Sequence, residues 1–310
     1  MARRLGALAV VGAALVVVVW GVGALLGGSD GDNDTVASGT AASTTETSDD
    51  PQGAAPTAEE STTTDTDVAD TATTVAETTT ERTGPPSSSD PARVLVVGDS
   101  DAGTFGPYLE RLLDATSIVD TELDYKVSAG LARPDFFDWP EALDEKIPGY
   151  DPEIVVVTFG GNDSQGLSEP GDELVWVVGD PIGNEEEWSA EYERRVAEVL
   201  EILTVDDRKV IWVGIPNDDN PDVTEKLAIQ NDAVKAALED YPEVTFIDTW
   251  NRFSGRDGNW AEFVIDPRDG EGKDVRADDG FHLNEAGAEI LAIDIAQAVR
   301  DELRAMNADI

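Results

Sequence analysis

The sequence has no cysteine and, in its 310 residues, a single histidine, His282. The absence of cysteine excludes disulfide bonds and cysteine-ligated metal sites. Any mechanism that needs a histidine base has one candidate. Positive charge is also scarce, since 21 Lys and Arg stand against 65 Asp and Glu and leave a formal net charge of −44. So acidic a chain repels phosphate backbones, which argues against nucleic acid as a partner.

The N-terminus reads as a membrane signal. Arg3 and Arg4 precede an uncharged apolar run over residues 5–26, and about 20 such residues are enough for a helix to cross a bilayer. We expect an uncleaved signal anchor over 1–28, with the arginines cytoplasmic and all that follows exported. The alternative is a secreted protein that loses this segment as a signal peptide.

Residues 29–91 contain almost no large apolar side chains and repeat Thr, Ser, Ala, Asp and Glu. Such a segment cannot bury enough surface to offset its chain entropy, so we expect a disordered, self-repelling stalk. Residues 92–310 remain acidic, with 51 acidic and 18 basic residues and a net charge of −33. Their apolar content suffices for one core, which makes 92–310 the predicted folded domain.

Strands and helices alternate along this domain. Apolar runs such as Val-Leu-Val-Val and Ile-Val-Val-Val are typical of strands buried on both faces, which predicts a central parallel sheet between two helical layers, a three-layer α/β/α sandwich. We expect strands at 93–97, 154–159, 210–215 and 244–249, and a weaker one at 125–128. We expect helices at 105–115, 187–203, 223–240 and 284–306.

Three polar clusters fall at ends of these elements, where open α/β sheets bind ligands. The first is Gly98-Asp99-Ser100, after the first strand and before a helix whose N–H groups can support an oxyanion. The second is Gly160-Gly161-Asn162-Asp163, in which Asn162 offers an amide donor. Each cluster taken alone is equally compatible with an ordinary turn.

The third cluster, residues 279–284, reads Asp-Gly-Phe-His-Leu-Asn and precedes the last helix. An acid three residues before a histidine can fold back, accept a hydrogen bond from the ring and leave the other ring nitrogen for a nucleophile. Asn284 suits the N-cap of the helix that follows. An isolated histidine is more often structural, but here it accompanies two other polar clusters at one predicted sheet edge.

Together with the glycine of Ser128-Ala129-Gly130-Leu131, these blocks resemble those of the SGNH hydrolases, the GDSL-type esterases, over about 92–305. Residues 130–140 also look like an uncharacterised extracytoplasmic bacterial branch of that superfamily. The resemblance implies a flavodoxin-like SGNH fold and no metal or organic cofactor.

Residue by residue, the resemblance implies a catalytic set. Ser100 would be the nucleophile, His282 the base and Asp279 its orienting acid. An oxyanion hole would be formed by the N–H groups of Ser100 and Gly130 and by the Asn162 side chain. The remaining motif residues, which would support the turns, are Gly98, Asp99, Gly161 and Asp163.

Two acidic residues complicate this assignment. Asp101 stands where the family usually has leucine. It either points outward without effect, or it raises the pKa of the base or disfavours anionic substrates. Asp278 competes with Asp279 for the third role, and the family's spacing favours Asp279. The acidic stretches 217–220 and 266–274 do not fit an EF-hand calcium loop.

The expected reaction is hydrolysis of an O-acyl ester, most simply O-acetyl on a cell-surface glycan, through an acyl-enzyme. Residues 164–186 and 251–278 lack a clear period and would overhang the crevice and set specificity. Trp176, Trp188, Trp250 and Trp260 could stack on sugars there or simply pack, whereas Trp212 belongs to the core. Two alternatives stay open: acyl transfer to a glycan hydroxyl, and a non-catalytic surface module on the same fold.

Overall fold

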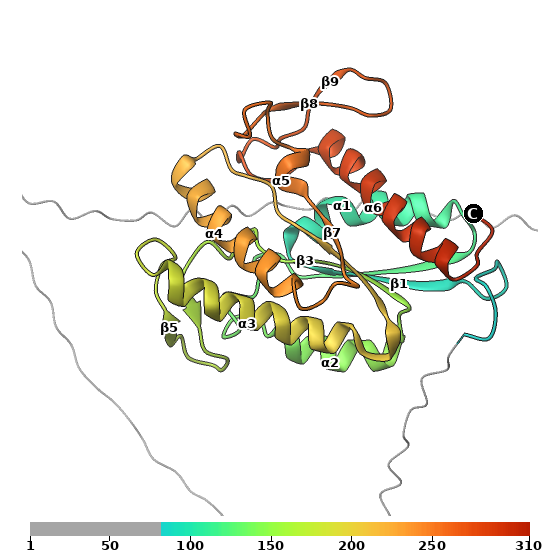
Figure 1. The fold of residues 1–310 in the computed structure, drawn as a ribbon, viewed down its shortest axis with the longest axis horizontal. Coiled ribbons are helices and arrows are strands. Elements are labelled where there is room, and N and C mark those ends of the chain that lie inside the picture. Colours follow the sequence, from blue (N-terminus) through green and yellow to red (C-terminus); the bar gives the residue numbers. More distant parts are fainter. Residues whose placement is uncertain (1–81) are drawn as a thin grey trace, which may run out of the picture. The chain divides into compact units, whose positions relative to one another are not determined.

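The computed structural model describes residues 82–310 (Figure 1). The predicted membrane anchor at 1–28 and most of the predicted stalk at 29–91 lie outside the described residues. Between residues 82 and 310 no helix is long and apolar enough to cross a membrane.

The centre of the fold is a five-stranded parallel sheet, as predicted. Its strands, in the order β2-β1-β3-β6-β7, are β2 (Val119–Tyr125), β1 (Ala92–Gly98), β3 (Ile154–Thr158), β6 (Lys209–Val213) and β7 (Thr245–Ile247). All neighbouring pairs are parallel. Every residue of β3 is buried, which is why this strand is a continuous apolar run in the sequence.

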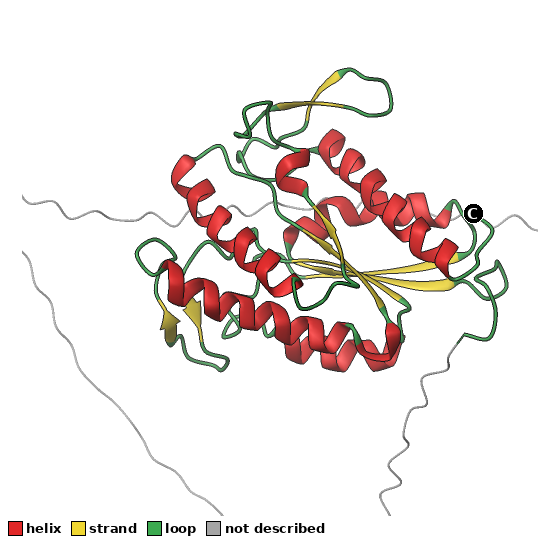
Figure 2. Ribbon diagram, viewed as in Figure 1, coloured by secondary structure: helices red, strands yellow, loops and turns green. Residues whose placement is uncertain are grey.

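Helices cover both faces of the sheet, so the domain is an α/β/α sandwich (Figures 1 and 2). On one face, α1 (Ser100–Asp114) and α6 (Glu285–Ala305) pack against alternate strand residues such as Val94 and Val96. On the other, α2 (Trp139–Tyr150), α3 (Glu185–Leu203) and α4 (Pro221–Leu238) pack against Leu95 and Val97. The two cores follow from the alternation of side chains along a strand.

Several elements differ from the prediction. The helix expected at 105–115 is α1, which begins at Ser100, so Ser100 is the first residue of the helix and not part of the turn before it. The strand expected at 125–128 is instead β2, Val119–Tyr125, and Ser128 has a positive φ of 64° in the turn that follows. The sequence of β2 alternates charged and apolar residues because it is an edge strand that is only partly buried. The helix α2 was not predicted, because it carries Pro148 and Gly149, which are typical helix breakers.

The segments that lacked a sequence period form small hairpins and single turns. One hairpin pairs β4 (Leu167–Ser168) with β5 (Trp176–Val178), and another pairs β8 (Phe263–Ile265) with β9 (Gly272–Asp274). The short helix α5 (Thr249–Arg252) follows β7, and a 3-10 turn, Val205–Asp207, precedes β6. These elements are too short to show a hydrophobic period.

The described chain begins in contact with the domain. Arg82 forms an ion pair with Glu153, which lies just before β3, and donates a hydrogen bond of 2.6 Å to the Pro91 carbonyl. The boundary between stalk and domain at residues 91 and 92 stays a prediction.

Candidate active site

Three side chains from the first and third sequence clusters meet above the ends of the strands. Ser100 opens α1, and its Oγ lies 2.9 Å from Nε2 of His282. Nδ1 of His282 lies 2.6 Å from Oδ2 of Asp279. Ser100 and His282 are 182 positions apart in the sequence, so only the fold brings them together.

Asp279 is held in place by more than the imidazole. Its Oδ1 accepts hydrogen bonds from the backbone N–H groups of Phe281 (3.1 Å) and His282 (3.0 Å). Partial burial works to raise the pKa of Asp279, but the hydrogen bond to His282, the charge of its ring and these two amides outweigh burial, so the pKa is lowered. Asp279 is therefore a carboxylate at neutral pH. Asp278, the alternative, makes no hydrogen bond to the imidazole within the described residues, whereas Asp279 does.

Asp99 ties the first cluster to the second. Its Oδ2 accepts hydrogen bonds from the N–H groups of Gly160 (2.9 Å) and Gly161 (3.0 Å), and its Oδ1 accepts one from Asp101 N (3.0 Å) as the N-cap of α1. Asp99 is completely buried, and burial, followed by the charge of Asp101, raises its pKa well above the usual range. The sequence assigned Asp99 only to a supporting turn.

Asp163 links the second cluster to the loop that carries Gly130. Its buried carboxylate accepts hydrogen bonds from the N–H groups of Leu131 (2.8 Å) and Ala132 (2.9 Å) and from the Tyr192 hydroxyl (2.7 Å). A Cβ at Gly130 would lie 2.0 Å from Asp163 Oδ1. Only glycine therefore allows this loop to approach the carboxylate so closely.

The three expected oxyanion donors have no hydrogen-bond acceptor within the described part of the chain. Among residues 82–310, nothing accepts a hydrogen bond from Gly130 N or from the Asn162 side chain. Ser100 N lies at the first position of α1, where a backbone N–H has no partner within the helix. These three groups stay available for an acceptor from outside the chain.

Asp101 does not point outward, which excludes the first of the two alternatives that the sequence left open. Asp101 is 8% exposed, and its Oδ2 has no hydrogen-bond partner within the described part of the chain. A Cβ at Gly161 would lie 3.1 Å from that oxygen. Burial raises the pKa of Asp101, the positive charges of His282 and Arg276 lower it, and the net shift is upward.

Some of the tryptophans are buried packing residues, and others are exposed to solvent. Trp188 and Trp212 are completely buried, so Trp188 is a core residue and cannot stack on a sugar. Trp260 donates a hydrogen bond of 2.7 Å to the Gly280 carbonyl and so supports the His282 loop. Trp250 packs beside a small cluster of apolar residues. Trp176 on β5 is 48% exposed.

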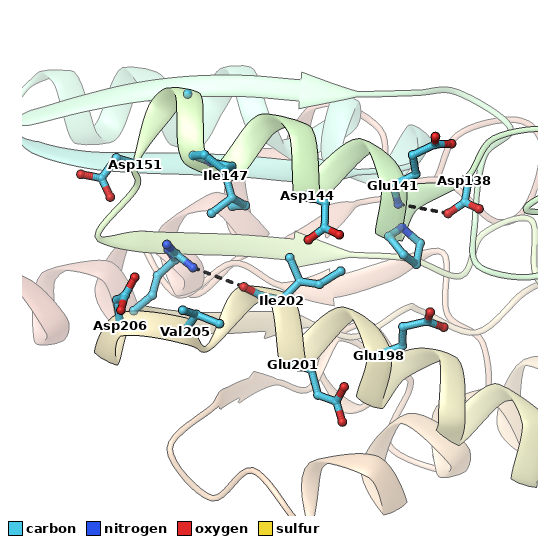
Figure 3. Close-up of a pocket in the computed structure, with 14 residues that line it drawn as sticks. Asp138, Glu141, Asp144, Ile147, Asp151, Glu198, Glu201, Ile202, Val205 and Asp206 are labelled. Carbon is cyan, nitrogen blue, oxygen red and sulfur yellow. Dashed lines mark hydrogen bonds between the residues drawn. The ribbon is translucent and has the colours of Figure 1, made fainter. Parts of the chain in front are cut away.

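A hollow of about 1000 Å³ lies elsewhere, between α2 and α3 (Figure 3). Ile147 and Ile202 point toward each other between the two helices, and acidic side chains surround them. Ser100, Asp279 and His282 do not line it. Within the described residues, no group of three or more Asp, Glu or His is placed to hold a metal ion.

The family described as "Protein of unknown function (DUF459)" matches residues 93–298 and therefore spans all four sequence blocks. The chain belongs to this family. DUF459 is an SGNH-like family, so the resemblance to the SGNH hydrolases is confirmed. A search for curated relatives of this DUF459 protein finds no match.

Several solved structures resemble the DUF459 chain distantly. A GDSL-like lipase from Bacteroides thetaiotaomicron is 16% identical, with a TM-score of 0.45 over 68% of this chain and 88% of that one. A family 3 carbohydrate esterase from Clostridium thermocellum is 14% identical, with a TM-score of 0.44 over 70% and 100%. A catalytic mutant of an acetylxylan esterase from Geobacillus stearothermophilus is 17% identical, with a TM-score of 0.47 over 67% and 94%.

Sequence reasoning missed two residues that shape the site of this DUF459 protein. Tyr192, from the middle of α3, is buried, and its hydroxyl donates a hydrogen bond to Asp163. Arg276 is buried beneath the His282 loop. Neither belongs to a sequence block. No local pattern could have found them, because their roles follow from their burial and their polar partners, which only the tertiary structure sets.

Replacing Asp101 by Asn tests the buried carboxyl. In an acid whose pKa is raised on folding, ionisation opposes folding, so the free energy of unfolding falls as pH rises above the unfolded pKa of about 4. Asp101→Asn should therefore be more stable than the wild type at pH 7, and the gain should shrink toward pH 4. Urea unfolding at several pH values measures the difference.

The matched control is Asp120→Asn, which changes an exposed aspartate of β2. It should show no comparable gain at pH 7. Parallel stability curves for wild type and Asp101→Asn would contradict the description of Asp101 as a buried carboxyl that resists ionisation.

Proposed function

We propose that the protein is a serine ester hydrolase that works through an acyl-enzyme. The observation that carries the proposal is the chain of contacts from Ser100 Oγ to His282 Nε2 (2.9 Å) and from His282 Nδ1 to Asp279 (2.6 Å). These distances suit a nucleophile, a base and a group that orients the base. The ordinary function of such a set is acyl transfer to water.

In the proposed reaction, His282 takes the proton of Ser100 as Oγ attacks the ester carbonyl. Asp279 accepts the Nδ1–H hydrogen bond, which fixes the tautomer and stabilises the imidazolium. The oxygen that becomes negative is bound by Ser100 N, Gly130 N and the Asn162 amide. His282 returns the proton to the departing alcohol, and water, activated by the same imidazole, releases the acid.

The proposed substrate is an O-acyl, in the first instance O-acetyl, group on a cell-envelope carbohydrate. The proposal combines the site with the predicted anchor at 1–28, which would hold the domain outside the membrane within reach of the envelope. Exposed Trp176, with the Arg133 guanidinium 5.4 Å from its ring centre, offers a flat surface for a sugar. We propose that the chain is a single-pass protein of the cell membrane with its catalytic domain outside the cytoplasm.

A fluorophosphonate probe tests the nucleophile. It should label the wild-type chain, because Ser100 is activated by His282, and should not label Ser100→Ala. Ser189→Ala, which removes a serine of α3 that makes no side-chain hydrogen bond in the described structure, is the control and should be labelled as the wild type is. Absence of labelling, together with no turnover of an aryl acetate, would favour a non-catalytic module.

Asn162→Ala tests the oxyanion hole. Losing one donor costs about 2.7–4 kcal/mol of barrier, so kcat for an aryl acetate should fall about 10²- to 10³-fold with little change in KM. The thermal unfolding midpoint should barely move, because no described residue bonds to the Asn162 amide. Ser164→Ala, in the same turn, should keep wild-type kcat. A wild-type kcat for Asn162→Ala would remove this residue from the mechanism.

A substrate panel tests the acyl group and the alcohol. Acetylated glycans and aryl esters of increasing acyl length are offered to the full chain, with product analysis in the presence and absence of an unacylated glycan. Release of acetate with a cutoff at short chains is the expected result. Faster turnover of long chains would indicate lipid substrates, and acylated acceptor glycan would indicate a transferase.

A further inference from the structure

Arg276 supports the turn that carries Asp279 and His282. Arg276 forms a bridge with Leu283 across the base of the turn, and Ala277 N donates a hydrogen bond of 2.9 Å to the His282 carbonyl. Gly280, inside the turn, has a φ of 82°, and a Cβ there would lie 2.3 Å from Asp219. The imidazole is therefore presented by a tight turn whose geometry depends on the residues beneath it.

The Arg276 guanidinium connects this turn to three other segments. It donates to the Phe281 carbonyl (2.9 Å), directly before His282, and to both oxygens of Asn217, after β6 (3.0 and 2.8 Å). It also donates to carbonyls on either side of the turn after α5, those of Phe253 (3.1 Å) and Ala261 (3.3 Å). The planar fork of an arginine can serve all these acceptors at once, which a single ammonium group cannot do.

Every one of these acceptors is uncharged, which is unusual for a buried arginine. Arg276 is 5% exposed, and within residues 82–310 it forms no ion pair. Buried charges are normally paired, since an unpaired one is costly. Burial lowers the pKa of Arg276 to about 10 against the opposing effect of four nearby carboxyls, those of Asp218, Asp101, Asp219 and Asp279.

The same carboxyls lie on the turn that carries His282 and on the segments next to it. Asp279 contacts its ring from the same turn, Asp101 acts on it from α1, and Asp218 and Asp219 lie in the loop after β6 that contacts Gly280. Arg276 lies close enough to all four carboxyls for the charges to interact, and it donates to the carbonyl of Phe281, directly before His282. Its positive charge therefore opposes theirs beside the turn that presents the imidazole.

We infer that Arg276 is a positioning residue for His282, which fixes the turn through the Phe281 carbonyl and places a positive charge among the carboxyls around that turn. The inference rests on the proposed function, because it gives the imidazole the role of base. The hydrogen bonds of the Arg276 guanidinium and its positive charge are two separate contributions, and two variants of the full chain distinguish them.

Arg276→Lys keeps the charge and loses most of the fork. Its kcat for an aryl acetate should fall at least about tenfold, since a small displacement of a reacting group is costly, while the acid limb of its kcat/KM profile stays where the wild type has it. Arg276→Gln loses the charge as well. Its acid limb should move to higher pH, because removing a neighbouring positive charge favours the imidazolium.

The imidazole can also be observed without any reaction. His282 is the sole histidine, so full chain labelled with ¹⁵N-histidine and made without a histidine tag gives one assignable pair of ring signals. The titration midpoint should rise in Arg276→Gln and stay unchanged in Arg276→Lys. If the wild type hydrolyses no ester, the proposed function fails, and the titration still decides the role of Arg276 in the charge of the ring.

Arg208→Gln is the matched control. Arg208 is also buried and also donates only to carbonyls, those of Pro152, Ile202 and Leu203, but it lies before β6, at the opposite end of the strand from Asn217. Its loss should lower the unfolding midpoint and leave the His282 titration and the pH profile unchanged. The inference is overturned if folded Arg276→Gln titrates as the wild type does, if Arg276→Lys keeps wild-type kcat, or if Arg276→Lys does not fold.

Discussion

The buried carboxylate of Asp99 is the interaction on which the site depends. It caps α1 and at the same time binds the two glycine amides that follow β3. The helix N-terminus that carries Ser100 is thereby fixed against the turn that carries Asn162. Three amide donors give this buried carboxyl its hydrogen-bond partners and lower its pKa, but burial and the charge of Asp101 outweigh them, so the pKa stays well above its usual range.

Asp163 repeats this arrangement one loop further on. It accepts two amides of the loop after Gly130 and the hydroxyl of Tyr192, so the helix α3 supports the loop through a side chain rather than through packing alone. Asp99, Asp163 and Arg276 thus each join segments that are remote in sequence. These three buried groups have full sets of partners, which define one geometry where an apolar core would accept several.

Much of this organisation could be predicted from the sequence, and the successes have a common cause. The buried strands β1, β3 and β6 and the long helices α3, α4 and α6 carry strong hydrophobic periods, so their type and place were correct. The sequence blocks also placed Ser100 and His282 at the same sheet edge. The failures were β2, an edge strand whose polar sequence lacks the continuous apolar run of the central strands, and α2, whose proline and glycine are typical of a loop.

The sequence by itself determined which residue types stand at the ends of which strands, because local periodicity and turn chemistry act over short stretches of chain. It left open where Asp101 points and whether Asp278 or Asp279 meets the imidazole. It also gave no hint that Arg276 lies beneath His282. Only the tertiary structure decided these points, because each depends on contacts between segments tens to hundreds of residues apart, whose burial and charge no local pattern records.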